Sequence, residues 1–282
     1  MRNYKFWIVI FSIFLFVSGF LEKEKATVEP QTKLSDYNFF EGTLANQIPT
    51  KELIPYSLNT PLFSDYAEKL RFVKIPEGQS VVYKPNEVFD FPIGTVIIKT
   101  FYFPNDFRDL SKGRKLLETR LLIHEEKAWK ALTYIWNEQQ TDAFLEVAGD
   151  TKEVNYIGID GKKQSLQYII PNQNQCKGCH NRNEILTPIG PSARQLNGEY
   201  NYEQGTENQL INWTKNGALK NMPALQDCPK MPTWNQPETG TLAERARAYL
   251  DINCAHCHNP KGPAMTSGLN LGMEETNETA FG

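Results

Sequence analysis

Short runs of β-branched and aromatic residues, separated by turn residues, fill the chain from about residue 34 to residue 170. The runs 94–104 and 114–126 are the clearest, and their residue types favour strands over helices. The pair Asp160-Gly161 stands between two further runs, and this dipeptide is typical of a tight hairpin turn. The pattern therefore predicts a β-rich domain over residues 34–170.

From residue 171 onward the pattern changes to helical spacing interrupted by proline-rich loops. Residues 204–215 fit one helix. Thr241 and Glu244 have the spacing of a capping box, and apolar residues then recur every four positions up to Leu250. We expect a helix here that leads directly to Cys254.

A third pattern is the uncharged apolar run 6–21, which follows Arg2 and Lys5. Sixteen residues are short for a membrane-spanning helix but suit the apolar region of a signal peptide. We therefore expect residues 1–21 to be a signal peptide, with an uncleaved N-terminal membrane anchor as the alternative. Both place the rest of the protein in the periplasm.

Composition adds limits but no chemistry. The 282 residues are 40% hydrophobic and 12% aromatic, enough for a sizeable core. The formal net charge is −3, and the basic residues form no block or stripe. We therefore expect no nucleic-acid partner.

Four of the five cysteines form two Cys-x-x-Cys-His motifs, CKGCH over residues 176–180 and CAHCH over residues 254–258. This is the attachment signature of c-type haem. Two thiols one helical turn apart can bond the two vinyl groups of one porphyrin, and the next residue can ligate its iron. The sequence therefore predicts two covalently bound haem c groups. The attachment residues are Cys176, Cys179, Cys254 and Cys257, and the iron ligands are His180 and His258.

Zinc and redox dithiol chemistry are the rival interpretations. Structural zinc sites usually hold their cysteine pairs about 15–20 residues apart, whereas Cys179 and Cys254 are 75 positions apart. A redox dithiol has no need of a following histidine in both motifs. Haem is the interpretation that accounts for both histidines.

The sixth iron ligand decides what a haem does, and two methionines are candidates for it. Met222 and Met231 are each followed by proline, which would fix the loop that presents the sulfur. We expect Met222 as a ligand, with Met231 as the alternative. Cys228 lies between them; thiolate ligation is chemically feasible, but an inert thiol is the simpler expectation. We expect His124 to be a hydrogen-bonded strand residue and His256 a surface or packing residue.

Several segments resemble a family of uncharacterised bacterial dihaem c-type cytochromes. They are PLFSDYA (61–67), FPIGTV (91–96), ETRLL (118–122), YIWN (134–137), QCKGCH (175–180), RARAYL (245–250) and NCAHCHNP (253–260). The likeness covers most of residues 34–271 and implies haem ligation by His180 and His258.

Two expectations follow from likeness alone. The second haem module should continue well past its motif, but only 24 residues follow His258. We therefore expect a C-terminally truncated fragment, with an exposed haem or one completed by a partner as the alternative. A fainter likeness of residues 91–99 is to hydroxylamine-oxidising monohaem cytochromes, whose haem lies on a β-sheet and is cross-linked to a lysine. Lys99 is the matching position, although we expect a solvated strand lysine there.

The expected fold class is α+β, with a β-rich N-terminal domain (34–170) followed by α-helical cytochrome c-type modules at 171–237 and 238–282. The expected function is single-electron transfer between a periplasmic oxidoreductase and a respiratory acceptor, with redox proteins as partners. A dihaem peroxidase or small-molecule oxidase with one open haem site is the alternative. No catalytic side chain is predicted.

Overall fold

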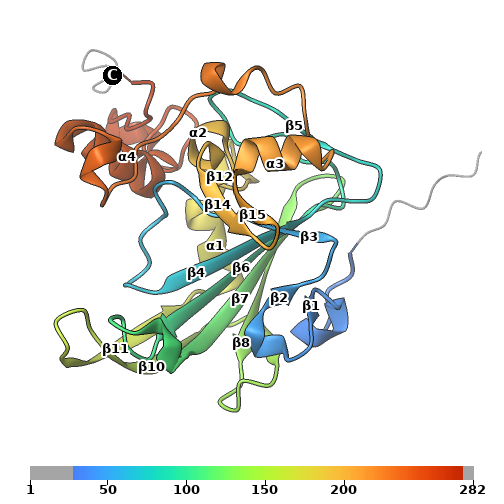
Figure 1. Cartoon of the computed structure of the whole chain (residues 1–282), viewed down its shortest axis with the longest axis vertical. Helices are drawn as coiled ribbons and strands as arrows, with labels where there is room; N and C mark the ends of the chain where they lie inside the picture. The colour runs from blue at the N-terminus through green and yellow to red at the C-terminus, as the bar shows by residue number, and fades with distance from the viewer. Residues whose placement is uncertain (1–27, 276–282) are drawn as a thin grey trace, which may run out of the picture.

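The computed structural model describes residues 28–275, and its centre is one six-stranded antiparallel sheet (Figure 1). Its strands, in spatial order, are β3 (Leu53–Pro55), β4 (Glu68–Lys74), β6 (Val96–Pro104), β7 (Arg114–His124), β8 (Trp129–Trp136) and β9 (Ala143–Glu146). The β-branched and aromatic runs noted in the sequence form these strands, because such side chains pack well on a pleated surface. The predicted β-rich architecture is confirmed.

The N-terminal segment covers one face of the sheet. It contains a 3₁₀ turn (Leu34–Tyr37) and a small hairpin of β1 (Phe40–Glu41) and β2 (Ile48–Pro49). Leu34 from this segment packs against Ile98 and Tyr134 from the sheet, and all three are fully buried. This layer is an ordinary hydrophobic core.

The opposite face of the sheet changes character along its strands. At one end Val73 and Ile97 join a cluster with Trp213 from the C-terminal half. At the other end Phe101 packs with Tyr168. Tyr168 belongs to the hairpin of β10 (Asp150–Ile157) and β11 (Lys163–Ile170). Its turn holds Gly161 at a φ of +76°, as the Asp-Gly signal predicts.

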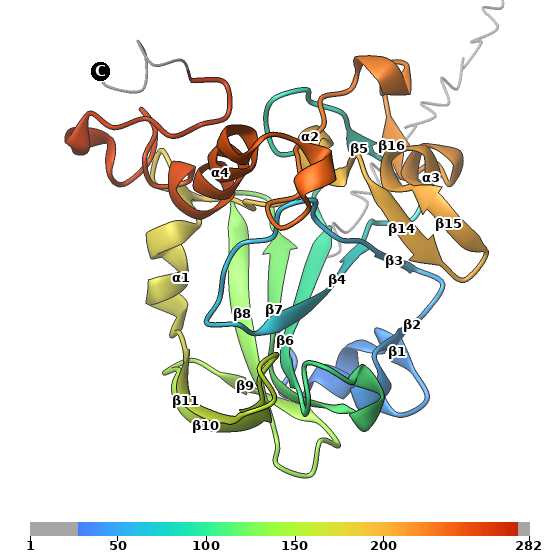
Figure 2. The same ribbon diagram turned by 60° about the vertical axis from the view of Figure 1, so that its left-hand side comes forward.

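The remaining elements lie after residue 170. The helices are α1 (Gln173–Cys179), α2 (Ala193–Leu196), α3 (Gln209–Lys215), α4 (Leu242–Leu250) and a π-helix (Asp251–Ala255). The strands are β12 (Asn181–Arg182), β13 (Ile185–Leu186), β14 (Glu199–Tyr202), β15 (Gly205–Asn208) and β16 (Leu219–Lys220), and β16 pairs in parallel with β5 (Val81–Val82). Figure 2 shows α1 beside β8, with α4 above the end of the sheet.

The expectation of α-helical cytochrome c-type modules after residue 170 is wrong. The four α-helices between residues 28 and 275 have four to nine residues each, and the hairpins β12–β13 and β14–β15 separate them. The helix predicted over 204–215 is divided, because residues 205–208 pair as β15 and only Gln209–Lys215 is helical. Frequent prolines and left-handed turn residues, such as Asn183 and Glu184, stop longer helices from forming.

The helix predicted to lead into Cys254 is confirmed. Helix α4 begins after Thr241, whose side chain accepts from the Glu244 amide while the Glu244 carboxylate accepts from the Thr241 amide. This reciprocal capping box satisfies two amides that the first helical turn leaves without partners. The π-helix then continues to Ala255 and carries Cys254.

The signal peptide or anchor predicted at residues 1–21 lies outside the described residues. Between residues 28 and 275, no helix is both long enough and apolar enough to cross a membrane.

Candidate haem-attachment site

The first motif lies on α1 and the turn that follows it. Asn172 caps the helix, because its side-chain oxygen accepts from the Gln175 backbone N–H. In return, the Gln175 side-chain oxygen accepts from the Asn172 backbone N–H. Cys176 is buried against Ala131 of β8, whereas Cys179, one turn later, is exposed. The cap and the contact with β8 therefore fix two thiols at the spacing of one helical turn.

His180 ends α1 and is oriented by a hydrogen bond. Its Nδ1 lies 2.9 Å from the carbonyl oxygen of Thr187. Because a carbonyl only accepts, Nδ1 carries the proton and Nε2 keeps its lone pair. Burial lowers the pKa of His180 to about 4, so the ring stays neutral near pH 7. A neutral imidazole held through its other nitrogen is the usual form of a metal-ligating histidine.

Cys176, Cys179 and His180 line a cavity of about 470 Å³, named here the His180 pocket. Its opposite wall is the second face of the sheet, with Ile97 and Ala131 among the lining residues. Cofactor sites commonly have volumes of about 300–1,000 Å³ and mostly apolar walls with a few polar groups. Two thiols and a neutral histidine form a donor set that fits a covalently attached haem c, beside a mainly apolar wall that also carries Arg71, Lys99 and Arg120.

The second motif begins on the π-helix that follows α4, and its histidine is also held by a hydrogen bond through Nδ1. Nδ1 of His258 lies 3.1 Å from the hydroxyl oxygen of Ser267. That hydroxyl donates its own hydrogen to the Ala264 carbonyl at 2.7 Å, so it accepts from His258. Nδ1 of His258 is therefore the donor in this hydrogen bond, which leaves Nε2 as the nitrogen that can face a metal.

The two motifs meet although they are far apart in the sequence. The Sγ atom of Cys257 lies 3.8 Å from the carbonyl oxygen of Gly178, inside the first motif. Burial and the neighbouring Cys179 thiol raise the pKa of Cys257. His256 lines the His180 pocket, and its Nδ1 is buried without a hydrogen-bond partner among the described residues. The expectation that His256 is only a surface or packing residue therefore misses its place in the pocket wall.

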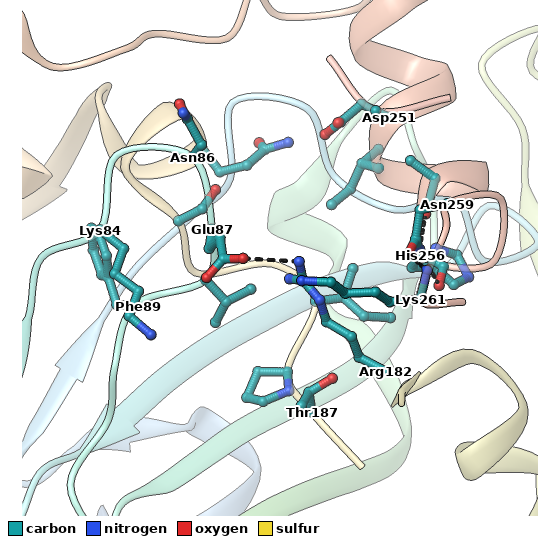
Figure 3. A pocket seen from close by; sticks show the side chains of 18 of the residues that line it. Lys84, Asn86, Glu87, Phe89, Arg182, Thr187, Asp251, His256, Asn259 and Lys261 are labelled. Carbon is teal, nitrogen blue, oxygen red and sulfur yellow. Dashed lines mark hydrogen bonds and ion pairs between the residues drawn. The ribbon is translucent and has the colours of Figure 1, made fainter. Parts of the chain in front are cut away.

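A second cavity of about 730 Å³ adjoins the first and is named here the Arg182 pocket (Figure 3). Arg182 and Glu87, which both line this cavity, form an ion pair at 2.9 Å (Figure 3). Cys179 and His256 line this pocket as well as the His180 pocket. The two cavities therefore adjoin where the two motifs meet.

The methionines proposed as sixth ligands lie elsewhere. The Met222 sulfur accepts from the Thr214 hydroxyl at 3.5 Å, and the buried Met231 sulfur accepts from the Gln195 amide at 2.9 Å. Neither is among the described residues that line the two pockets. Cys228 is buried, with its thiol 3.7 Å from the Ala224 carbonyl.

His124 and Lys99 also depart from the sequence expectations. His124 stacks on Trp129 with ring centroids 4.4 Å apart, and its Nδ1 has no hydrogen-bond partner in the described chain. Lys99 is not a solvated strand residue, because it lies half-buried on the wall of the His180 pocket. Within residues 28–275, no three His, Cys, Asp or Glu side chains gather closely enough to hold a metal ion, so the zinc alternative gains no support.

Three charged residues, Arg71, Lys99 and Arg120, line the His180 pocket. Sequence reasoning considered only Lys99, and expected it to be solvated. Each of the three is a charged residue within a run that otherwise contains apolar strand residues. Such a charged residue is the sequence feature that could have indicated a functional position. Only the strand register, which the sequence does not reveal, places the three side by side.

No protein-family model, curated protein or solved structure matches this chain.

Proposed function

We propose that the protein is an exported dihaem c-type cytochrome that transfers single electrons between a periplasmic oxidoreductase and a respiratory acceptor. The observation that carries the proposal is that both motifs end in a histidine whose Nδ1 donates to a protein oxygen. His180 uses Thr187 and His258 uses Ser267, so each Nε2 is free to ligate iron. If the two motifs had arisen by chance, there would be no reason to expect both histidines to be oriented by a hydrogen bond through Nδ1.

In this proposal each residue of the motifs has one task. Cys176 and Cys179 attach one haem, Cys254 and Cys257 attach the other, and His180 and His258 ligate the two irons. A bound haem supplies an iron that changes its charge by one electron. Met222 remains the proposed sixth ligand, with Met231 as the alternative, and each would have to leave its present hydrogen bond.

The contact between the motifs favours a function in which electrons pass from one haem to the other over one in which each haem reacts independently. Cys257 touches Gly178, and Cys179 lines both cavities. Two haems attached at these cysteines would be close neighbours, and electrons pass readily between close redox centres. The resemblance to dihaem cytochromes and the N-terminal apolar run agree with a periplasmic carrier.

The test is the number of covalent haems per chain, measured by alkaline pyridine assay on protein exported in a host with c-type maturation. We expect two haems in the wild type and one in either variant pair, Cys176→Ser/Cys179→Ser or Cys254→Ser/Cys257→Ser. Cys228→Ser is the matched control and should retain both haems. A wild-type chain without haem would reject the proposal and revive zinc or dithiol chemistry.

One observation favours a second candidate, a dihaem peroxidase or small-molecule oxidase with an open iron site. Neither Met222 nor Met231 is among the described residues that line the His180 pocket. The substitution Met222→Ala separates the two functions. An electron carrier ligated by Met222 loses its sulfur-ligated low-spin spectrum, whereas an enzyme with an open site keeps its spectrum unchanged.

A further inference from the structure

The middle of the sheet's second face is positively charged, whereas the clusters at its two ends are hydrophobic. Arg71 lies opposite Lys99 in the strand register, and Lys99 lies opposite Arg120. All three side chains line the His180 pocket. Like charges directly opposite each other destabilise a sheet, and removing them from water costs further free energy. A negatively charged group in the pocket would therefore stabilise this arrangement of three cations.

The nearby carboxylate of Glu118 is engaged by Arg120. The Arg120 guanidinium donates to both Glu118 oxygens, from Nε at 2.7 Å and from Nη2 at 2.6 Å. The Tyr168 hydroxyl adds a third donor to this fully buried carboxylate at 2.8 Å. This bidentate pair neutralises Arg120 and leaves the other two cations without a counter-charge.

Arg71 and Lys99 form no ion pair with any residue in the described part of the chain. Arg71 is only 8% exposed, and its buried Nη2 has no hydrogen-bond partner there. The Lys99 amine lies 4.6 Å from the centroid of the Phe101 ring. Burial and then the neighbouring Arg71 and Arg120 charges lower the pKa of Lys99 well below its usual value. An anion in the pocket would accept a hydrogen bond from Arg71 and would offset the repulsion between the Arg71 and Lys99 charges.

We propose that Arg71 and Lys99 form an oxyanion site in the His180 pocket, which binds a carboxylate or a small inorganic oxyanion. A guanidinium group suits such a ligand because its donors match two oxygens at once. The site goes beyond the proposed function, since it needs no haem to bind an anion.

The carboxylate has two potential sources, a porphyrin attached at the first motif or a free anion. Cys176 packs on Ala131 of β8, and Arg71 lies on β4, three strands away. Strands are spaced about 4.8 Å apart, so Arg71 lies about 14 Å from the cysteine end of the pocket. A porphyrin carries its carboxylates on the edge opposite its vinyl groups, which corresponds to the Arg71 end.

The test compares the wild type with Arg71→Met, Lys99→Met and Lys74→Met, each purified from a maturation-competent host. Lys74 is the matched control because it is also on β4 but pairs with Glu52 and does not line the pocket. Thermal unfolding is followed against sodium nitrite and sodium acetate, with ionic strength held constant by sodium chloride. Haem content and midpoint potential are measured on the same samples.

A free oxyanion as ligand raises the unfolding temperature of the wild type and Lys74→Met in a saturable manner, and Arg71→Met and Lys99→Met lose this response. Porphyrin carboxylates as ligand give no such response, but Arg71→Met then has a lower haem midpoint potential than Lys74→Met. If Arg71→Met and Lys99→Met match Lys74→Met in both the oxyanion response and the midpoint potential, the proposed oxyanion site is wrong. If Arg71→Met does not fold, Lys99→Met makes the comparison. If the purified chain carries no haem but its unfolding temperature still rises with oxyanions, the oxyanion site is supported and the cytochrome function is rejected.

Discussion

The thiol sulfur of Cys257 lies 3.8 Å from the carbonyl oxygen of Gly178, a residue 79 positions earlier, and this contact joins the two motifs. The Cys179 thiol is a hydrogen-bonding neighbour of Cys257 and contributes to the rise in its pKa. Cys176, by contrast, is buried, and burial raises the pKa of its thiol. In the sequence Cys179 is paired with Cys176, whereas in the structure Cys179 lies near Cys257 of the other motif.

This grouping predicts which disulfide forms when no haem is attached. In chain produced without c-type maturation and treated with diamide, we expect Cys179 and Cys257 to pair first. Cys176 should react slowly, because its thiol is buried, whereas Cys179 is exposed and Cys257 is only partly buried. Peptide mapping by mass spectrometry identifies the linkage. Predominant pairing within either motif would contradict the arrangement, and Cys257→Ser is the control that removes the inter-motif peptide.

If the second motif carries the proposed haem, the hydrogen bond from His258 to Ser267 predicts an effect confined to that haem. In Ser267→Ala the Nδ1 proton loses its acceptor, so the imidazole becomes a weaker electron donor to ferric iron. We expect the midpoint potential of that haem to rise while the first haem is unchanged. Redox titration followed by absorbance measures both. Ser165→Ala, a hydroxyl on β11 that bonds Glu153, should leave both potentials unchanged. An unchanged second potential in Ser267→Ala would exclude this role.

Local sequence patterns identified the strands and the capping box at Thr241, because each depends on neighbours within a few residues. The helical modules were wrongly predicted for the same reason. Residues 205–208 have helical spacing, yet they pair as β15 with β14 (Glu199–Tyr202), and tertiary pairing overrides such weak preferences. The lining of the His180 pocket depends on strand register and on the approach of two distant motifs, and neither is encoded locally.

The Glu118–Arg120 pair predicts a large loss of stability when its carboxylate is removed. Glu118→Gln leaves the Arg120 guanidinium, 26% exposed, without its counter-charge. Breaking a buried pair on one side costs about 3–5 kcal/mol of unfolding free energy. The control is Glu138→Gln, because Glu138 is 62% exposed and pairs with Lys115 on the surface. Such surface pairs contribute at most about 1 kcal/mol, so equal losses in urea unfolding for the two variants would contradict the burial argument.

The burial of Lys69, together with the nearby charge of Arg71, also predicts a pH dependence of stability. Burial, followed by the charge of Arg71, lowers the pKa of Lys69 to about 8. In the unfolded chain a lysine titrates near its ordinary value of about 10.4, so between these values the unfolded state binds more protons. The unfolding free energy attributable to Lys69 therefore rises as the pH increases from about 8 to about 10.4.

Urea unfolding at pH 7 and pH 9.5 measures this rise, which for a shift of this size is on the order of 2 kcal/mol. Lys69→Met removes the titrating amine and should make the rise smaller, and it should also raise the stability at pH 7, where the folded state holds the charge unfavourably. Lys74→Met, from the same strand but paired with Glu52, should keep the full rise. Equal pH dependence in the two variants would show that Lys69 is not strained by its neighbours. A loss of the rise in Lys69→Met alone would identify Lys69 as its source.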